Sequence, residues 1–469
     1  MAITASVQKA VDHNVNGLLA GLRWDSSHLT YSFPSDSSFY GNSYGAGEPQ
    51  KNFQPLNAIQ GAAVREVFRM LSSVTGLSFA EIEETKTDHA TLRLAGADIP
   101  APAWTYLPGE SPMAGDVWFN TSGGDFDQPL PGSYAYYIFI HEIAHAVGLK
   151  HGHESGPYGA MDAAHDSMEY SVTTYRSYVG ADGKLVENET WGFAQSLMMY
   201  DIAALQHLYG ANFSTNSGNT EYRWDPATGQ ASINGARQAA PGDNRVFMTV
   251  WDGGGVDTYN LWNYTTNMVI DLRPGAWSRM SGEQTALLGY QQEARGNIAN
   301  ALQYQGDTRS LIENAIGGSG NDRINGNAAS NLLKGRTGDD RIYGFEGNDT
   351  LNGGPGRDVL TGGSGNDVFM FDGRPNRAKN LDRITDFSPV DDTIHLDNAV
   401  FTKVGAAGKL IAGAFRVGRE AHDSSDRIIY DRKTGALSYD PDGNGKAAQI
   451  QFAHLNKGLK LAAADFWIV

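Results

Sequence analysis

A nine-residue repeat between residues 317 and 370 constrains the fold of this chain more than any other feature. Six units follow one another without an insertion: GGSGNDRIN, GNAASNLLK, GRTGDDRIY, GFEGNDTLN, GGPGRDVLT and GGSGNDVFM. Each unit begins with glycine, which permits a turn, and has an apolar residue at its eighth position, which marks a short strand. A flexible glycine-rich linker has no reason to keep an apolar residue at every ninth position. The repeat therefore predicts a parallel β-roll built from six-residue turns and three-residue strands.

The sixth position of the repeat is aspartate in five units and asparagine in the second. Turns stacked along the two edges of a roll bring these carboxylates close to the backbone carbonyls of neighbouring turns. Such sets of oxygen atoms suit Ca²⁺, which takes six to eight oxygen ligands. Of the 56 glycines, 14 fall within these 54 residues, so the glycine excess marks ordered turns. The repeat therefore predicts structural calcium sites.

The repeat resembles that of the RTX (repeat-in-toxin) family of exported bacterial proteins, whose consensus is GGxGxDxUx. The resemblance implies ligands from positions 2, 4 and 6 of one repeat and from positions 1, 3 and 6 of the repeat two units later. Where there is no carboxylate, the backbone carbonyl would serve, and the unit over residues 326–334 fits least well. The implied ligand sets are Gly318, Gly320 and Asp322 with Gly335, Thr337 and Asp340; Arg336, Gly338 and Asp340 with Gly353, Pro355 and Asp358; and Phe345, Gly347 and Asp349 with Gly362, Ser364 and Asp367.

The chain changes character near residue 210. Before that point, apolar residues recur at helical spacing in some segments and alternate with polar residues in others. This mixture predicts an α+β domain. Helices are expected over residues 57–73, 134–148 and 197–209, and strands over 29–33, 91–94 and 117–119.

After residue 212, glycine, asparagine and aspartate separate short β-prone runs, and the helical pattern fades. An all-β domain is therefore expected to follow the α+β domain. The expected boundaries are 21–212 for the first domain and 213–469 for the second, with an N-terminal helix or a propeptide over 1–20.

Residues 141–151 read HEIAHAVGLKH and match the pattern HExxHxxGxxH. His141 and His145 are four residues apart, so on a helix they share one face and reach the same metal ion. Gly148 is suited to the left-handed conformation that ends a helix and turns the chain. His151 then returns as the third ligand. Three imidazoles leave Zn²⁺ one position for water, whose pKa the metal lowers.

Glu142 lies next to the first histidine of this motif, close enough to take a proton from zinc-bound water without being a ligand. We therefore expect Glu142 to be the general base. The alternative is three unrelated histidines around a helix. Among the other histidines, His153 is the nearest competitor as a ligand, and a solvated turn residue is the better interpretation of it.

The histidine motif is that of the metzincin metalloproteases. Together with the RTX repeats, it makes the chain resemble the serralysin family of bacterial alkaline proteases over nearly its whole length. The resemblance implies a metzincin-type zinc protease domain followed by an all-β, calcium-binding parallel β-roll or sandwich. Residues 103–107 would then be the edge strand that pairs with substrate, and residues 201–212 the helix that closes the protease domain. The further calcium ligands that it implies are Asp252, Gly254, Gly255, Asp257 and Glu313.

The family also carries a methionine beneath the zinc and, two residues later, a tyrosine that binds the metal in the resting enzyme. Tyr175 occupies the tyrosine position here, but Thr173 stands where the methionine is expected. Met168 and Tyr170 have the same spacing, with neighbours that fit less well. Because the methionine is a packing platform and not a ligand, its loss is expected to soften the site without abolishing the chemistry.

Composition and the chain ends narrow the function further. The absence of cysteine excludes disulfides, cysteine-ligated metals and thiol catalysis, and a formal charge of −17 argues against nucleic acid as a partner. No apolar run reaches the roughly 20 residues that a bilayer requires, and the N-terminus lacks a signal-peptide pattern. Residues 465–469, DFWIV, resemble a type I export signal and would equally well form a buried last strand. Residues 440–445, DPDGNG, open like an EF-hand loop, but a hairpin turn is the preferred interpretation.

These observations predict a secreted, extracellular zinc endopeptidase with one catalytic Zn²⁺ and several structural Ca²⁺ ions. Its expected partners are protein or peptide substrates, the type I secretion machinery and a proteinaceous inhibitor. The chain is expected to act as a monomer, with no nucleic acid and no membrane. One alternative is a catalytically impaired calcium-binding RTX module, which only Thr173 supports. The other, an RTX toxin, would need an apolar membrane-inserting domain that the sequence lacks.

Overall fold

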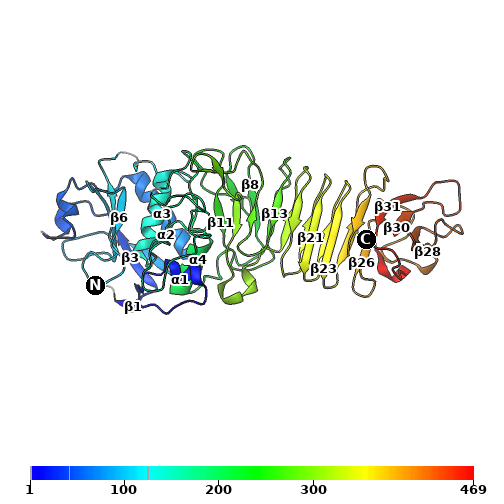
Figure 1. Cartoon of the computed structure of the whole chain (residues 1–469), viewed down its shortest axis with the longest axis horizontal. Helices are drawn as coiled ribbons and strands as arrows, with labels where there is room; N and C mark the ends of the chain where they lie inside the picture. Colours follow the sequence, from blue (N-terminus) through cyan, green and yellow to red (C-terminus); the bar gives the residue numbers. More distant parts are fainter. Residues whose placement is uncertain (1–2, 42, 124–125, 185) are drawn as a thin grey trace.

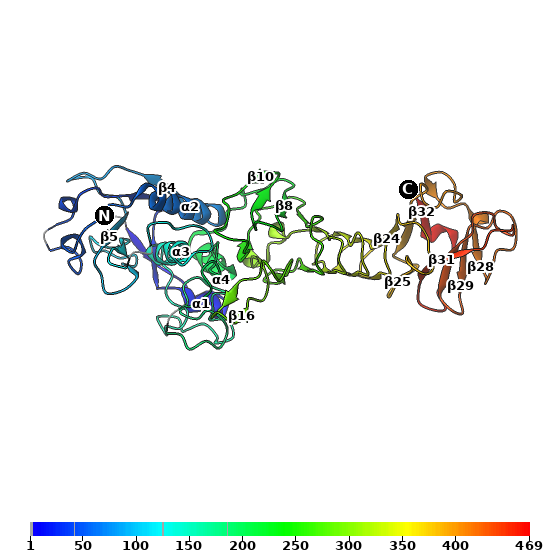
Figure 2. The same ribbon diagram turned by 90° about the horizontal axis from the view of Figure 1, so that it is seen from above.

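The computed structural model describes residues 3–41, 43–123, 126–184 and 186–469. The molecule is elongated, with the helices and one sheet at the N-terminal end (Figure 1). A stack of short parallel strands forms the middle, and further strands close the C-terminal end (Figures 1 and 2). The fold is thus mixed α/β, with few helices and many parallel strands.

A five-stranded sheet with two long helices beside it forms the N-terminal region. Its strands run in the order β4-β3-β5-β7-β6, and only the last pair is antiparallel. A separate two-stranded antiparallel sheet of β1 and β2 lies near the chain start. The strands are β1 (Thr4–Ser6), β2 (Leu22–Trp24), β3 (His28–Ser32), β4 (Ser78–Glu81), β5 (Leu92–Ala97), β6 (Ala103–Thr105) and β7 (Val117–Asn120), and the helices are α1 (His13–Leu18), α2 (Ala58–Val74), α3 (Tyr134–Ala146) and α4 (Met199–Tyr209).

The predicted helices and strands of this region are present. The apolar stripe of α2 is buried, and Asn57 caps the helix by accepting hydrogen bonds from the backbone N–H groups of Ile59 and Gln60. The helix predicted over 134–148 is α3, and the one predicted over 197–209 is α4. The three predicted strands coincide with β3, β5 and β7.

The N-terminal segment contains the expected helix, α1, which packs against α4. Val15, Leu18 and Leu19 are buried in the same core as α2 and α3. Residues 1–2 of this segment lie outside the described residues. Residues 13–19 are therefore an integral part of the core of the N-terminal region.

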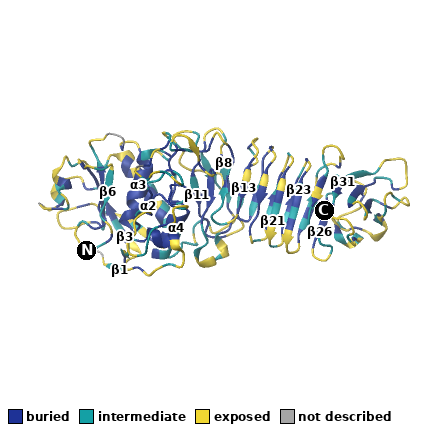
Figure 3. Cartoon of the chain, in the orientation of Figure 1, coloured by how far each residue is buried: buried dark blue, intermediate teal, exposed yellow. Residues whose placement is uncertain are grey.

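The repeats form the predicted parallel β-roll. Strands of successive repeats alternate between two facing sheets, so each strand of the first four repeats pairs with the strand 18 residues further on, as Leu332 does with Thr350. The eighth-position residues are all 0% exposed and fill the space between the sheets. In Figure 3 the buried residues follow the strands of the roll. These core residues are Ile324, Leu333, Ile342, Leu351, Leu360 and Phe369.

Two large sheets run through the C-terminal half. The eleven-stranded sheet consists of β10 (Ala236–Arg237), β9 (Ala231–Ile233), β8 (Glu221–Trp224), β12 (Thr258–Asn260), β18 (Asn314–Ile316), β20 (Leu332–Lys334), β22 (Thr350–Asn352), β24 (Val368–Phe371), β26 (Thr393–Leu396), β32 (Phe466–Ile468) and β27 (Gly408–Lys409). The nine-stranded sheet consists of β13 (Val269–Asp271), β19 (Arg323–Asn325), β21 (Arg341–Glu346), β23 (Val359–Ser364), β25 (Asp382–Ile384), β31 (Ile450–His454), β30 (Ala436–Tyr439), β29 (Ile428–Asp431) and β28 (Phe415–Val417). Smaller sheets contain β11 (Met248–Val250), β17 (Ile298–Asn300) and β14 (Trp277–Ser278), and β15 (Leu287–Leu288) with β16 (Gln292–Glu293).

Two segments near the C-terminal end have the structures expected of them, a turn between antiparallel strands and a buried last strand. Residues 440–445 lie in the connection between the antiparallel strands β30 and β31, as a hairpin turn requires. Residues 466–468 form β32, an inner strand between β26 and β27, with Phe466 and Ile468 buried. Within the described ranges, no helix has the length and apolar character needed to cross a membrane.

Candidate active site and metal-binding sites

Helix α3 carries the first two histidines of the motif and is buried along nearly its whole length. Ser133 caps its first turn by accepting a backbone hydrogen bond of 3.1 Å. After the helix, Gly148 has a φ of 110°, a conformation that residues with a side chain rarely adopt. The chain turns back at this glycine, and His151 therefore returns beside His141 and His145.

Each of the three imidazoles uses its Nδ1 atom in a hydrogen bond to an oxygen acceptor. Because these acceptors are carbonyl or carboxylate oxygens, every Nδ1 carries the hydrogen and every Nε2 is left with a free lone pair. Such partners orient imidazoles for metal binding. The pairs are His141 with the Val172 carbonyl (2.7 Å), His145 with the Leu149 carbonyl (2.8 Å) and His151 with the Glu154 carboxylate (2.9 Å).

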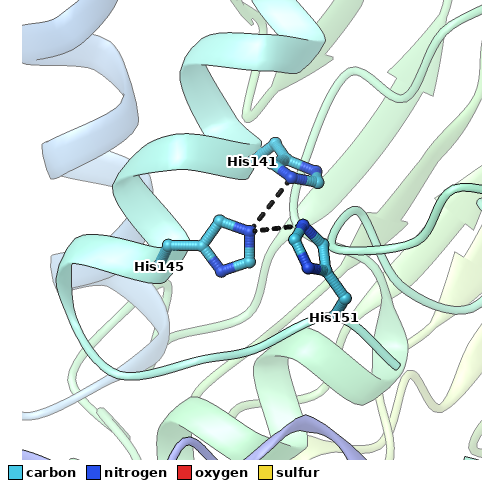
Figure 4. A group of neighbouring side chains, drawn as sticks. All are labelled: His141, His145 and His151. Carbon is cyan, nitrogen blue, oxygen red and sulfur yellow. Dashed lines mark hydrogen bonds between the residues drawn. The ribbon is translucent and has the colours of Figure 1, made fainter. Parts of the chain in front are cut away.

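The three Nε2 atoms converge on one point, as Figure 4 shows. Nε2 of His145 lies 3.0 Å from that of His141 and 3.2 Å from that of His151. Because the Nδ1 hydrogens of all three imidazoles are directed at oxygen acceptors, each Nε2–Nε2 contact brings two lone pairs together, and a cation between them would relieve the repulsion. A tetrahedral zinc ion with Zn–N bonds of about 2.1 Å would space its nitrogen ligands by about 3.4 Å. The donor set therefore fits zinc.

Protonation also favours metal binding by this group. Burial lowers the pKa of His141 and of His145, and together with nearby positive charge it lowers the pKa of His151 to about 2. The imidazoles are therefore neutral at pH 7, the form in which they ligate a metal.

Glu142 is buried beside the histidines, and its carboxylate meets strand β6. Oε2 of Glu142 accepts a 2.7 Å hydrogen bond from the hydroxyl of Thr105. Burial raises the pKa of Glu142 to about 7, and the hydrogen bond from Thr105 opposes that rise. Within the described residues β6 pairs only with β7, so its other side is an open edge. The buried carboxylate of Glu142 is therefore hydrogen-bonded to a strand that has a free edge.

Tyr175, and not Tyr170, lies beside the imidazoles. Its ring centroid is 4.3 Å from that of His151, and burial raises its pKa, so the hydroxyl stays protonated as a donor. The ring of Tyr170 instead packs 4.9 Å from that of His165. His153 is exposed and its ring lies 5.1 Å from that of Tyr175, at the rim of the site.

The repeat aspartates form two buried ladders along the roll. In one, the backbone N–H of Asp322 donates to Oδ1 of Asp340 (2.7 Å), and that of Asp340 donates to Oδ1 of Asp358 (2.8 Å). In the other, the backbone N–H of Asp349 donates in the same way to Asp367 (2.9 Å). These contacts hold the carboxylates of repeats two units apart next to each other.

The second oxygen of four of these carboxylates is buried and has no hydrogen-bond partner among the described residues. Burial raises the pKa of Asp340 and Asp349 to about 7 and that of Asp358 to about 8. An unpaired buried carboxylate is costly, and a cation would relieve that cost. The donor set therefore fits calcium, which prefers oxygen ligands. The unpaired atoms are Oδ2 of Asp340, Asp349, Asp358 and Asp367.

The remaining predicted roll ligands lie in turns that stack as the repeat requires. The backbone N–H of Gly338 donates to the carbonyl of Pro355 (3.2 Å), and that of Gly347 donates to the carbonyl of Ser364 (3.0 Å). Arg336 and Phe345 have φ of 76° and 80°, in the left-handed region that a glycine would normally occupy. A Cβ on Gly335 would collide with Oδ2 of Asp340, which explains the glycine that opens this turn.

The predicted ligands ahead of the roll also come together. The backbone N–H of Asp257 donates to Oε2 of Glu313 (2.7 Å), and that of Gly254 donates to Oδ1 of Asp252 (2.8 Å). Oδ2 of Asp257 is buried without a partner in the described part of the chain, and burial with the charge of Asp252 raises its pKa to about 8. Gly255 has a φ of 141°, which keeps the loop tight. This loop has the same carboxylate chemistry as the roll.

Comparison with known proteins identifies the family. Residues 211–407 match the family described as Peptidase M10 serralysin C terminal. The metalloprotease AprA of Pseudomonas entomophila is 33% identical over 459 residues, which cover 93% of this chain and 86% of that protein. The chain belongs to the serralysin family. Serralysin G of Dickeya chrysanthemi and serralysin of Proteus mirabilis are each 31% identical to it, over 66% of this chain and 61% of their own lengths.

Membership of the serralysin family makes the chain a zinc metalloendopeptidase by class. The family implies zinc, and the chain presents a triad of histidines. The resemblance noted from the histidine motif and the repeats is therefore confirmed. The alternative of three unrelated histidines around a helix disagrees with the convergence of their Nε2 atoms.

Several residues of these serralysin sites escaped sequence reasoning. Thr105 and Glu154 contact the site through side-chain hydrogen bonds that no motif signals. Asp382 and Asp392 extend the two carboxylate ladders, accepting from the backbone N–H groups of Asp358 (3.1 Å) and Asp367 (3.0 Å). Their spacings of 24 and 25 residues depart from the 18 of the repeat, so the nine-residue register could not find them.

Proposed function

We propose that this chain is a secreted zinc endopeptidase that hydrolyses peptide bonds in proteins outside the cell. The observation that carries the proposal is the convergence of three Nε2 atoms beside a buried carboxylate at an open strand edge. His141, His145 and His151 would hold the zinc, and Tyr175 would complete its coordination in the resting state. Zinc, when bound, polarises carbonyl and water oxygens.

Glu142 supplies the general base. Its ionised carboxylate takes a proton from the attacking water as the water oxygen adds to the scissile carbonyl carbon. Glu142 then returns that proton to the departing amine as the C–N bond breaks. Thr105 holds Oε2 of Glu142 at 2.7 Å, which keeps the carboxylate in one orientation.

Strand β6 supplies the substrate-binding edge. An extended peptide that pairs with its free side is held by backbone hydrogen bonds, which suits a protease that accepts many sequences. The neighbours of Thr105 are anchored from the other face of the strand: Trp104 donates to Glu48 at 3.1 Å and Tyr106 donates to Glu48 at 2.7 Å. Because Thr105 itself contacts Glu142, the bound peptide lies over the base.

Tyr175 supplies a hydrogen-bond donor to the tetrahedral intermediate. Burial raises its pKa, so its hydroxyl keeps the hydrogen at neutral pH. A donor placed beside His151 is near the position where the oxyanion develops, and such donors stabilise the transition state.

Calcium would bind the loop over 251–257 and the edges of the roll, where the unpaired carboxylate oxygens lie. The ion would offset the buried charge and couple metal binding to folding of the roll. Export by type I secretion machinery, a monomeric state and regulation by a proteinaceous inhibitor belong to the same proposal.

The test uses zinc-loaded wild-type protein and Glu142→Gln, which keeps the side-chain shape but removes the base. We expect both to contain one zinc per chain, and the variant to lose casein hydrolysis by roughly a thousandfold or more. Zymography with and without a zinc chelator is the control. If the wild-type chain binds calcium but never clears the gel, it is a catalytically impaired calcium-binding module.

A further inference from the structure

Thr173 is a fully buried hydroxyl residue that touches the backbone on both sides of His151. Its Oγ1 donates a 3.0 Å hydrogen bond to the carbonyl oxygen of Lys150. Its own carbonyl oxygen accepts from the backbone N–H of Gly152 at 3.4 Å. The exposed fraction of Thr173 is 0%. One residue therefore holds the two peptide groups that flank the third histidine.

The segment that contains Thr173 is held in place by hydrogen bonds to helix α4. Asp201, in the first turn of that helix, accepts hydrogen bonds from the hydroxyl of Ser171 (2.6 Å) and from the backbone N–H of Val172 (2.8 Å). The backbone N–H of Thr173 donates to the hydroxyl oxygen of Ser171 at 3.1 Å. The Ser171 hydroxyl donates to the carboxylate and lies 3.0 Å from the hydroxyl of Thr173, which donates to the carbonyl of Lys150.

The same segment reaches a second histidine. The carbonyl of Val172 accepts the hydrogen bond from Nδ1 of His141. The chain of contacts thus runs from Asp201 through residues 171–173 to His141 on one side and to the peptides flanking His151 on the other. Asp201, residues 171–173 and His141 are all buried, where a hydrogen bond orients its partners most firmly.

We propose that Thr173 is a positioning residue for His151: its hydroxyl fixes the loop that presents this histidine and so slows the loss of the metal. The inference rests on the proposed zinc site. A residue that only filled space at position 173 would be replaceable by valine, which has nearly the same shape. Buried polar partners that orient a metal ligand are worth roughly 10- to 100-fold in metal affinity.

The experiment compares Thr173→Val, which removes the hydroxyl, with Thr173→Ser, which keeps it. The zinc-loaded full-length proteins are mixed with excess chelator, and zinc release is followed with a colorimetric indicator. We expect Thr173→Val to release zinc about tenfold faster than wild type, and Thr173→Ser to stay within about twofold. Melting temperatures with and without zinc are the second readout, and zinc is expected to raise that of Thr173→Val by less.

Equal release rates for wild type and Thr173→Val would overturn the inference. So would a Thr173→Val variant that melts lower by the same amount with and without zinc, because that is the behaviour of a merely structural residue. If Thr173→Val does not fold, Thr173→Ala is compared with Thr173→Ser, which again differ by the hydroxyl. Wild-type protein that binds no zinc refutes the proposed function, whereas tight zinc binding with identical rates in all variants refutes the role of Thr173 alone.

Discussion

Replacing Asp340 by asparagine should change the stability of the roll in opposite directions with and without calcium. Asp340 is 1% exposed, and its Oδ2 atom has no partner in the described part of the chain. Burial raises its pKa from 3.8 to about 7, which at 1.36 kcal/mol per pKa unit corresponds to roughly 4 kcal/mol of destabilisation above neutral pH. Relaxation of the turn and water penetration relieve part of that penalty, so we expect asparagine to stabilise the calcium-free roll by about 2 kcal/mol.

With calcium, the sign reverses. Asp340 belongs to two of the predicted ligand sets, and asparagine offers calcium a neutral oxygen in place of a charged one. We expect calcium affinity to fall about tenfold at each of the two sites, which together costs about 2.8 kcal/mol at a fixed calcium concentration and exceeds the gain of about 2 kcal/mol in the calcium-free roll. The assay is calorimetric melting of the full-length protein in excess chelator and in saturating calcium. Asp339→Asn is the matched control, because Asp339 is an exposed neighbour on the same turn.

The pH dependence follows from the same carboxylates. Their pKa values are raised in the folded chain, so between 3.8 and about 7 the folded state holds protons that the unfolded state has released. In chelator the roll should therefore gain stability as pH falls through this window, and Asp340→Asn should show a smaller gain. If the variant is destabilised equally in chelator and in calcium, Asp340 is not a calcium ligand and the reasoning fails.

Three further substitutions test other parts of the account. Thr105→Val removes a hydrogen bond to a buried carboxylate that is worth about 1.5–3 kcal/mol, so kcat/KM should fall roughly 10- to 100-fold. Thr105→Ser keeps the hydroxyl and should retain the wild-type kcat/KM. Equal activity of Thr105→Val and Thr105→Ser in a peptide assay would exclude the role of the hydroxyl. Tyr175→Phe should lower kcat by about a hundredfold with little change in KM or zinc content, and an unchanged kcat would count against an oxyanion contact. Leu351→Ala, in the core of the roll, should destabilise it by about 2–5 kcal/mol in denaturant melts without changing zinc content; a loss below 1 kcal/mol would contradict its packing.

Most of the fold can be predicted from local sequence patterns. The apolar residues of the repeat, such as Ile342 and Leu351, recur at an interval that only one strand arrangement satisfies, and the structure pairs them as expected. The three histidines were predictable because their spacing is set by the helix and by the turn at Gly148. In both cases, the residues that determine the structure lie within a few positions of one another in the sequence.

The contacts that support the site were not predictable, because they join residues far apart in the chain. Thr105 lies 37 residues from Glu142, and Ser171 lies 30 residues from Asp201. The first depends on how β6 passes over α3, and the second on where α4 begins, neither of which a motif encodes. Asp382 was missed for a different reason, since a longer loop breaks the nine-residue register while the carboxylate ladder continues.

The central claim is that zinc sits between the three converging histidines. A crystal structure of the zinc-loaded protein, with anomalous diffraction recorded on both sides of the zinc edge, tests it most directly. We predict a single strong zinc peak at about 2.1 Å from Nε2 of His141, His145 and His151. A zinc peak elsewhere, or none at this point in protein that hydrolyses casein, would contradict the account.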